Sequence, residues 1–577
     1  MSRKLEEKNR QRKASEEGLV SSPWGGRLAV ALVYPNTYHH GMSNLGFQYA
    51  YDFFNRQDEA LCERFFLPDK EDIKDCLHKK LPLRSLDSGR PLADFDVVCF
   101  SISFENDYLN LPILFELGRL PFFSAQRNER HPLVVCGGVV AFLNPEPLAD
   151  IMDLFAVGEG EILLPQLLGG LLTPGVDKAE LLKALASRPG FYVPAFYEIR
   201  YRDDGTIEEY LPADGVPQRV QRQWLRDLDA SSCRSFVFCR DSEFADMALL
   251  EISRGCGRGC RFCAAGNIYL PPRERSPQQL ADDIRAMAGA RKRVGLVSAA
   301  VSDYSELPEL CREIVGQRAD FSVSSVRIDS LDRDLLRQLV ACGHRTLTLA
   351  PEAGSQRLRN VINKNIDEEQ ILDCVKMATE EEIINLKFYF LIGLPTETDE
   401  DIAEMEALVE KIHRVWMDES KKIGRLGNLT LSVNPFIPKP FTPFQWMAME
   451  QTAVLKTRMG LIRTFVGRLD RTQVFFESLR AAELQAFLAR GDRRIGMALI
   501  PLSSGKNLKQ ACREVGLDPD FYTRRERAED EKFPWEILDI GVKRDYLREE
   551  FWKSLRGELS PSCGTVCRGC GVCEKEN

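Results

Sequence analysis

The sequence contains no run of eighteen or more apolar residues, so we expect no segment that spans a bilayer. Residues 1–18 are rich in charge and have no apolar core, which excludes a secretory signal and predicts a disordered tail over residues 1–26. Positive charge is not in excess either, because 77 Lys and Arg stand against 86 Asp and Glu. The net charge of −9 argues against a chain built chiefly to grip nucleic acid or an anionic membrane.

The length and the cysteines limit the class of protein. With 577 residues, 44% of them hydrophobic, the chain can bury a large core and should divide into several domains. Its 17 cysteines, without an export signal, indicate reduced thiols and a cytoplasmic protein. Ten cysteines stand alone and are expected to be small buried apolar residues, whereas the other seven form two tight clusters.

Residues 27–190 predict a doubly wound parallel sheet. Continuous apolar runs are separated by helix-like segments and fall at residues 27–35, 94–104, 131–140 and 152–161. Ligands of such sheets bind at the carboxyl ends of the strands. A ligand of this domain is therefore expected near residues 34–44, 101–106, 137–144 and 158–161.

A second α/β domain follows a connector. The connector, residues 191–245, contains a hairpin pattern around Asp204–Gly205. Six apolar strands alternate with helices over residues 246–450, which predicts a partial (βα)6 barrel with its active site at the carboxyl ends of the strands. The strands are expected at 247–253, 294–300, 321–328, 345–352, 386–395 and 428–436. Residues 451–560 are predicted to be helical, and residues 561–577 form a Cys-rich tail.

Three cysteines come directly after the first barrel strand. Cys256, Cys260 and Cys263 have the spacing C-x3-C-x2-C, and glycines in and before the first gap allow the tight turn that brings three sulfurs to one centre. A zinc site would need a fourth ligand from elsewhere, and a zinc knuckle more often pairs two C-x2-C units. The pattern therefore favours an iron–sulfur cluster over zinc.

This cysteine motif, with Phe262 before its last cysteine, resembles the radical S-adenosylmethionine superfamily. The resemblance implies that the three cysteines hold three irons of a [4Fe–4S] cluster and that the fourth iron binds S-adenosylmethionine. Reductive cleavage would then give a 5′-deoxyadenosyl radical that abstracts hydrogen from a substrate. The resemblance also implies an oxygen-sensitive enzyme that takes electrons from a donor such as flavodoxin or ferredoxin and acts on a small-molecule or macromolecular substrate.

The same resemblance suggests contacts on the barrel rim. Phe262 lies within the motif, and superfamily analogy places S-adenosylmethionine contacts where the later strands end. A helix-capping acid is the alternative for Glu352, and a surface ion pair is the alternative for Arg327. The segment SAAVSDY stands where superfamily members usually carry a glycine-rich GGE sequence, so a role for Ser298 departs from the pattern. The candidate residues after strands two to six are Ser298, Ser302, Asp303, Arg327, Glu352, Gly393 and Asn434.

Residues 27–190 also resemble cobalamin-binding-type domains that precede a radical module, notably in PNTYHHGMSNLGFQYAYDF. The motif D-x-H-x-x-G, whose histidine ligates cobalt, is absent. His39 and His40 lie in a loop at a strand end, where a histidine is more often solvated than metal-bound. Gly137–Gly138 and residues 158–161 suit either a nucleotide-like cofactor tail or ordinary turns. With cobalamin, the expected reaction is transfer of a methyl or other carbon group; without it, hydrogen abstraction is followed by rearrangement or oxidation.

The second cysteine cluster lies in the tail. Cys563, Cys567, Cys570 and Cys573 have the spacing C-x3-C-x2-C-x2-C, which predicts metal binding. A second iron–sulfur cluster is slightly preferred over a structural zinc. Two other functions remain as alternatives: modification of RNA or a ribosomal component, including methylthiolation, and a metal-stabilised binding protein without catalysis. Nucleic acid is therefore retained as a partner but is not favoured.

Overall fold

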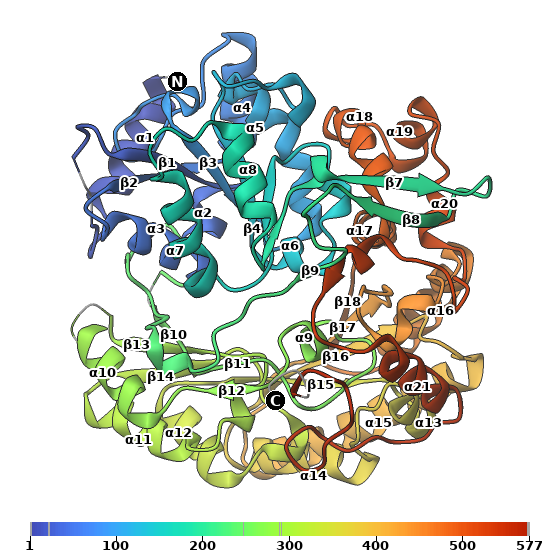
Figure 1. Ribbon diagram of the computed structural model, residues 1–577. Coiled ribbons are helices and arrows are strands. Elements are labelled where there is room, and N and C mark those ends of the chain that lie inside the picture. The colour runs from blue at the N-terminus through green and yellow to red at the C-terminus, as the bar shows by residue number, and fades with distance from the viewer. Residues whose placement is uncertain (1–2, 21–22, 246, 288, 290, 574–577) are drawn as a thin grey trace. The chain divides into compact units, whose positions relative to one another are not determined.

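The computed structural model describes residues 3–20, 23–245, 247–287, 289 and 291–573. The chain divides into two compact units (Figure 1). The first comprises Met1–Ala248, Phe487–Pro519 and Asp530–Gly541, and the second comprises Leu249–Ala486, Asp520–Glu529 and Val542–Asn577. The region predicted as one helical segment, residues 451–560, is thus shared between both units.

The first unit contains a six-stranded sheet in the order β2-β1-β3-β4-β5-β6. All neighbouring strands are parallel except β5 and β6. The order, with β1 inside the sheet, is that of a doubly wound fold whose switch point lies between β1 and β3. The predicted fold class is confirmed. The strands are β1 Leu28–Tyr34, β2 Ala60–Phe66, β3 Val97–Ser101, β4 Leu133–Gly137, β5 Leu154–Ala156 and β6 Phe191–Tyr192.

Helices cover both faces of this sheet because its strands are apolar on both sides. One core cluster joins strand residues such as Val30 and Val135 to α3, α7 and α8. On the other face Phe100 of β3 stacks on Phe115 of α5, with 5.4 Å between ring centroids. The helices of the first unit are α1 Arg3–Ala14, α2 Tyr38–Gly41, α3 Leu45–Asn55, α4 Lys70–His78, α5 Leu111–Gly118, α6 Val139–Leu143, α7 Gly160–Leu171, α8 Lys178–Ala186, α18 Leu499–Ser503 and α19 Leu508–Glu514.

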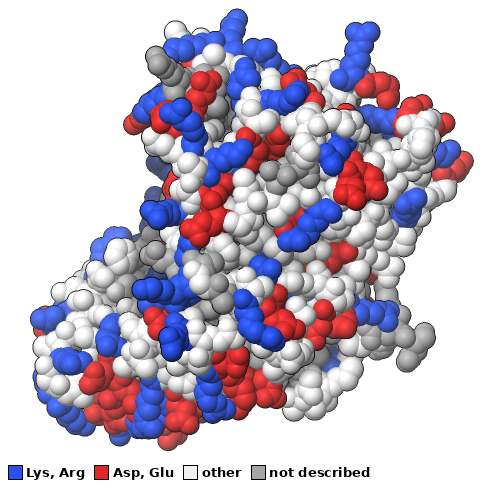
Figure 2. All heavy atoms as spheres, turned by 90° about the vertical axis from the view of Figure 1, so that its left-hand side faces the viewer, with Lys and Arg blue, Asp and Glu red and all other residues white. Residues whose placement is uncertain are grey.

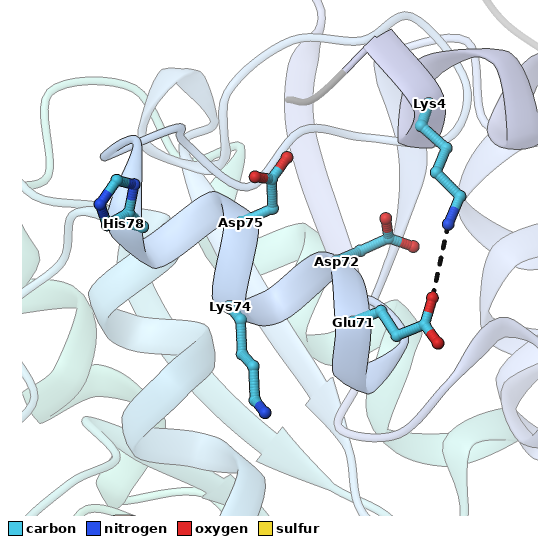
Figure 3. A pocket seen from close by; sticks show the side chains of 6 residues that line it. All are labelled: Lys4, Glu71, Asp72, Lys74, Asp75 and His78. Carbon is cyan, nitrogen blue, oxygen red and sulfur yellow. Dashed lines mark hydrogen bonds and ion pairs between the residues drawn. The ribbon is translucent and has the colours of Figure 1, made fainter.

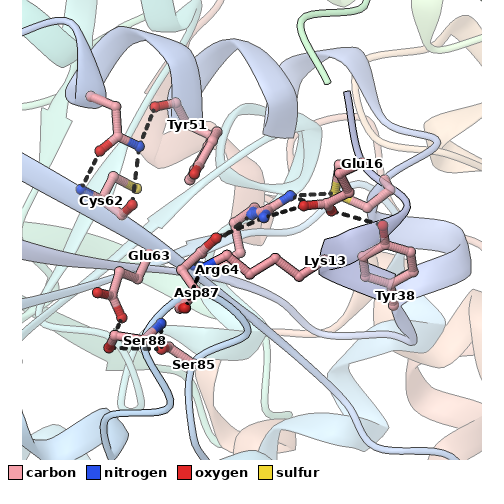
Figure 4. A network of polar contacts seen from close by, with 12 residues as sticks. Lys13, Glu16, Tyr38, Tyr51, Cys62, Glu63, Arg64, Ser85, Asp87 and Ser88 are labelled. Carbon is pink, nitrogen blue, oxygen red and sulfur yellow. Dashed lines mark hydrogen bonds and ion pairs between the residues drawn. The ribbon is translucent and has the colours of Figure 1, made fainter. Parts of the chain in front are cut away.

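The N-terminal segment forms helix α1 and is anchored, in contrast to the disordered tail expected from the sequence. Arg64 of β2 is fully buried and donates to both carboxylate oxygens of Glu16, at 2.7 and 2.8 Å. Arg64 also donates to Asp87, at 2.7 Å, and Tyr38 donates to Glu16 (Figure 4). A buried cation requires such partners, and here Glu16 supplies one. Because the segment is rich in charged residues, its composition did not predict the buried contact between Glu16 and Arg64.

The connector contains the expected hairpin. Strand β7, Tyr197–Tyr201, pairs antiparallel with β8, Ile207–Pro212, and Gly205 takes the positive φ of +82° that the turn requires. The hairpin prediction is confirmed. A short parallel pair, β9 Val220–Gln221 with β19 Leu538–Asp539, joins the connector to the returning segment of the same unit.

The second unit contains two sheets in the orders β10-β13-β14 and β15-β16-β17-β18. The strands are β10 Met247–Glu251, β13 Arg293–Val297, β14 Asp320–Val323, β15 Thr346–Glu352, β16 Asn385–Ile392, β17 Leu429–Pro435 and β18 Thr472–Phe476. All six predicted barrel strands are present. β18 extends the series into the region predicted as helical, because its short run TQVFF pairs parallel with β17.

Helices connect these strands in βα order, as a barrel of parallel strands requires. They are α9 Ala265–Ile268, α10 Pro277–Met287, α11 Leu307–Gly316, α12 Arg333–Ala341, α13 Gln356–Val361, α14 Glu368–Glu380, α15 Asp399–Lys422 and α16 Thr452–Val466. Near the unit boundaries lie α17 Leu479–Arg490 and α20 Pro519–Thr523, and α21 Arg544–Leu555 precedes the tail. Across the described residues, no helix is both long and apolar enough to cross a bilayer.

Candidate active site

The three-cysteine loop follows the first barrel strand. It begins after β11, Ser253–Arg254, which pairs antiparallel with β12, Arg273–Glu274, and it ends at α9. Gly255 and Gly259 take φ values of +90° and +74°, which glycine adopts without strain. A Cβ atom on Gly255 would lie 2.6 Å from the carbonyl oxygen of Tyr269, so the turn also needs glycine for space. The expected glycine-dependent wrap is therefore present.

The three thiols lie near one another and are half-buried. Burial raises the pKa of Cys263 to about 11, and the Cys260 and Cys256 thiols contribute to that rise. Burial also raises the pKa of Cys256, again with a contribution from Cys260. Such mutual effects fall off with distance, so all three sulfurs share one neighbourhood.

This donor set fits an iron–sulfur cluster. Thiols whose pKa is raised stay protonated at neutral pH until a metal displaces the protons. Within the part of the chain that the structure describes, no three His, Cys, Asp or Glu side chains are grouped to hold a single metal ion. Each thiolate of a four-iron cluster binds its own iron, so a cluster does not require the sulfurs to surround one ion.

Arg261 lies between the second and third cysteines and anchors the loop to neighbouring segments. Its side chain is fully buried and its guanidinium lies 3.1 Å from the carboxylate of Glu550 on α21. It also donates to the carbonyl oxygens of Asn360, Val361 and Glu558, at 3.1, 3.1 and 2.8 Å. The cysteine loop is thereby tied to both α13 and the segment after α21. The sequence analysis missed this residue, although its place inside the motif was a usable signal.

A chain of ion pairs lies on the rim beside the loop. Arg258, within the loop, donates to Asp303 at 2.8 Å and to Asp329 at 2.9 Å. Arg327 donates to the same Asp329 carboxylate at 2.9 and 3.1 Å. The predicted residues Asp303 and Arg327 are therefore brought together, and two residues that the sequence analysis missed, Arg258 and Asp329, link them.

Glu352 lies at the same end of the barrel. It follows an irregularity in the β15 ladder and has a φ of +67°, a backbone conformation that is uncommon for residues other than glycine. Burial raises the pKa of its carboxyl group, and the charges of Lys364, 3.3 Å away, and Arg327 oppose that rise. Burial lowers the pKa of Arg327, but Asp329, with a smaller contribution from Cys260, more than offsets this effect and raises the pKa. Arg327 thus lies near both Cys260 and Glu352.

The remaining rim candidates have different surroundings. The Ser298 hydroxyl is 2.6 Å from that of Ser253, just before the cysteine loop. Gly393 donates its N–H to the buried carboxylate of Glu397, so this backbone group is already engaged within the protein. Asn434 is half-buried in β17, opposite Leu391, and Phe262 is half-buried in the loop itself.

In the first unit the candidate histidines make ordinary polar contacts. His39 Nδ1 lies 3.5 Å from Asp241, and His40 Nδ1 lies 3.0 Å from the Thr37 hydroxyl. The two predicted glycine turns pack against the protein's own backbone. A Cβ atom on Gly138 would lie 2.4 Å from the carbonyl oxygen of Ile102, and one on Gly158 would lie 1.9 Å from that of Gln223. Close packing therefore accounts for both glycines.

The cysteines of the tail lie in the second unit, beside the first cysteine loop. Cys570 is buried, Cys563 is half-buried, and Cys567 and Cys573 are exposed. Burial raises the pKa of Cys570, and the Cys563 and Cys567 thiols contribute. The backbone N–H of Cys563 donates to the carbonyl oxygen of Gly257 at 2.7 Å.

A surface hollow of about 340 Å³ lies between α1 and α4, away from every predicted site residue. Exposed charges of both signs line it, and Lys4 lies 3.4 Å from Glu71 (Figure 3). On the face drawn in Figure 2, lysine and arginine side chains lie among aspartate and glutamate side chains. This mixed pattern matches the acidic net charge and does not form a single basic field.

The comparisons with known proteins agree with this site. Residues 250–409 match the radical SAM superfamily, and residues 46–194 match the N-terminal region of radical SAM proteins. The uncharacterized protein MJ0966 of Methanocaldococcus jannaschii is 29% identical over 478 residues, which cover 82% of this chain and 90% of that protein. The putative methylthiotransferase MJ0865 of the same organism is 24% identical over 53% of this chain and 63% of its own length.

A solved structure also resembles the chain. The radical S-adenosylmethionine methyltransferase TsrM from Kitasatospora setae, with cobalamin and a [4Fe–4S] cluster bound, aligns over 73% of this chain and 77% of its own, with a TM-score of 0.47 and 18% identity. The cysteine loop lies inside the matched superfamily domain. The chain therefore contains a radical S-adenosylmethionine domain, preceded by a domain of the type found at the N-terminus of such proteins.

Proposed function

We propose that this enzyme holds a [4Fe–4S] cluster on Cys256, Cys260 and Cys263 and uses it with S-adenosylmethionine to abstract hydrogen from a substrate. When bound there, the cluster and S-adenosylmethionine supply a 5′-deoxyadenosyl radical. The observation that carries the proposal is the gathering of three mutually interacting thiols beside Arg327 and Glu352 at one end of the barrel.

Two rim residues match the charges of S-adenosylmethionine. Arg327 presents a planar cation suited to a carboxylate, and Glu352 presents a carboxylate suited to an ammonium group or ribose hydroxyls. Both are largely buried, with side chains 15% and 16% exposed, so their interactions with a ligand are only weakly screened. Arg258 and Asp329 hold Arg327 in place, and Lys364 does the same for Glu352.

The test is anaerobic reconstitution followed by reduction in the presence of S-adenosylmethionine. We expect 5′-deoxyadenosine and methionine as products. We also expect that a soluble one-electron donor such as flavodoxin or ferredoxin can replace the chemical reductant. Cys260→Ala should lose the cleavage, together with the part of the cluster absorbance that this site contributes. Cys374→Ala, which alters a lone buried cysteine of α14, is the matched control and should keep both. An intact cluster without cleavage would contradict the proposal.

For the substrate step we propose transfer of a methyl group through cobalamin held by the first unit. The carboxyl ends of β1 and β3 form the switch point where doubly wound sheets bind ligands. Polar side chains collect there: Asn36 donates to Asp107 at 2.8 Å and Asn44 donates to Ser103 at 3.1 Å. His39 and His40 have protein partners, so this proposal assigns no cobalt ligand.

Corrinoid absorbance tests the cobalamin proposal. Protein incubated anaerobically with hydroxocobalamin and desalted should retain the corrinoid, and bulky substitution at the switch point, Ser103→Trp, should reduce retention. Ser187→Trp, on the partly exposed end of α8 in the same unit, is the control and should leave retention unchanged. Absence of corrinoid at saturating ligand would exclude cobalamin-dependent transfer.

Methylthiolation of RNA or of a ribosomal protein is the second candidate, favoured by the likeness to the putative methylthiotransferase MJ0865. Mass spectrometry of tRNA and ribosomal proteins from cells with and without the gene decides between the candidates. A methylthio group that disappears with the gene would favour this reaction, whereas unchanged spectra would exclude it.

A further inference from the structure

The tail repeats the sequence of the first cysteine loop. Residues 256–263 read CGRGCRFC and residues 563–570 read CGTVCRGC, so both follow the pattern C-G-x-x-C-R-x-C. The three cysteines, the glycine after the first and the arginine after the second coincide. Because the first copy is built to hold a cluster, the same spacing in the second copy points to the same kind of ligand set.

The two copies lie against each other within the second unit. Besides the 2.7 Å hydrogen bond from Cys563 to Gly257, a Cβ atom on Gly257 would lie 2.9 Å from the carbonyl oxygen of Cys563. A Cβ atom on Gly259 would lie 1.8 Å from the guanidinium of Arg568. The glycines of the first copy therefore leave space for the backbone and the arginine of the second.

The tail is also held at both ends. Before its cysteines, Ser560 accepts a hydrogen bond from Arg261, and its N–H donates to Asn363 at 2.9 Å. At the third tail cysteine, Lys543 donates its backbone N–H to the carbonyl oxygen of Cys570 at 2.8 Å. Val572 is 5% exposed. These contacts give the segment a fixed course, which a solvated terminal tail does not need.

Glycines shape the turns between the tail cysteines. Gly564, Gly569 and Gly571 have φ values of +97°, +68° and +96°. No atom would lie within 4 Å of a Cβ atom on Gly564 or Gly569, so these two glycines serve the backbone conformation and not close packing. Positive φ values allow the tight turns that a short segment needs to bring several cysteines toward one centre, and Gly255 and Gly259 have such values in the first copy.

We propose that Cys563, Cys567 and Cys570 are ligands of a second iron–sulfur cluster, held beside the first. The proposal rests on the cluster proposed for the first loop, whose cysteine pattern it repeats, and goes beyond the radical chemistry assigned to that loop. Cys573, three residues beyond Cys570, is within the same segment and completes a four-thiolate set of the kind that closes such clusters.

Iron analysis of the anaerobically reconstituted full chain tests the proposal. We expect about eight irons per chain and about four in Cys567→Ala, since each cluster contains four. Cys260→Ala should likewise keep about four, and the double variant should keep none. Cys512→Ala, a buried lone cysteine of α19, is the control and should match the wild type. Mössbauer spectra of ⁵⁷Fe-labelled wild-type protein count the clusters without any substitution.

The outcomes separate this proposal from the first. Unchanged iron in Cys567→Ala, a single cluster in the wild-type spectrum, or stoichiometric zinc that is lost with Cys567 would each overturn the second cluster. A wild type with two clusters that does not cleave S-adenosylmethionine would instead overturn the proposed function and leave the second cluster standing.

Discussion

Replacement of Arg261 by methionine should destabilise the second unit strongly. Methionine keeps much of the apolar stem but removes the guanidinium, which leaves the Glu550 carboxylate, 3% exposed, without its arginine partner. Breaking a buried ion pair from one side costs about 3–5 kcal/mol. At about 2–4 °C per kcal/mol, the thermal midpoint should fall by roughly 6–20 °C.

The reasoning can be checked through Glu550 itself. Burial would raise the pKa of Glu550, but the Ser560 hydroxyl and the charges of Arg261 and Lys553 keep it below the ordinary value. Glu550→Gln should therefore be destabilising alone, yet add little to Arg261→Met, because the two changes remove the same interaction.

The measurement is calorimetry, under anaerobic conditions, of the wild type, Arg261→Met, Glu550→Gln and the variant with both substitutions. Arg285→Met serves as control, since Arg285 is exposed on α10, where it pairs with Asp282 and donates to the carbonyl oxygen of Ala281. The midpoint of this variant should stay close to that of the wild type. Equal midpoints for Arg261→Met and Arg285→Met, or fully additive effects of Arg261→Met and Glu550→Gln, would refute the argument.

Two further predictions concern pH and backbone packing. Burial raises the pKa of Glu397 from 4.5 to about 7, so the folded state binds more protons than the unfolded state in that interval. This contribution to stability is present below pH 4.5 and is lost as pH rises through about 7. In urea unfolding, the free energy of unfolding of the wild type should therefore fall by roughly 3 kcal/mol over this range, relative to that of Glu397→Gln. A difference in free energy of unfolding between the two proteins that stays constant with pH would contradict the raised pKa of Glu397. Gly138→Ala should cost about 3 kcal/mol or more, because its Cβ would lie 2.4 Å from the Ile102 carbonyl oxygen. Gly175→Ala, at a similar positive φ but with open space, should cost only about 1 kcal/mol in the same measurement, and equal costs would show that the contact is unimportant.

The features that could be predicted from the sequence are local ones. The strand at 97–101 is a short apolar run and the strand at 429–435 alternates apolar with polar residues, and both patterns are typical of strands. The spacing of the three cysteines is visible within eight residues. β2 was missed because Glu63 and Arg64 interrupt its apolar run, and only the remote Glu16 and Asp87 make the burial of Arg64 acceptable.

The missed parts of the site depend on long-range contacts. Lys364 lies 3.3 Å from Glu352, which follows a register shift in the β15 ladder, and no local pattern predicts such a shift. β18 is short and half-exposed, so its pairing with β17 and not its composition makes it a strand. Such contacts join segments that are far apart in the sequence, so local sequence patterns do not predict them.

The contact between Arg261 and Glu550 has a consequence for synthesis, because 289 positions separate the two residues. At roughly 5–20 residues per second, translation takes about 15–60 s to pass from one to the other. During that interval the cysteine loop has left the ribosome while α21 and the segment that closes behind Arg261 do not yet exist. The thiols of the cysteine loop are then accessible both to iron delivery and to oxygen. Which of the two reaches them first depends on how the cell protects the nascent chain.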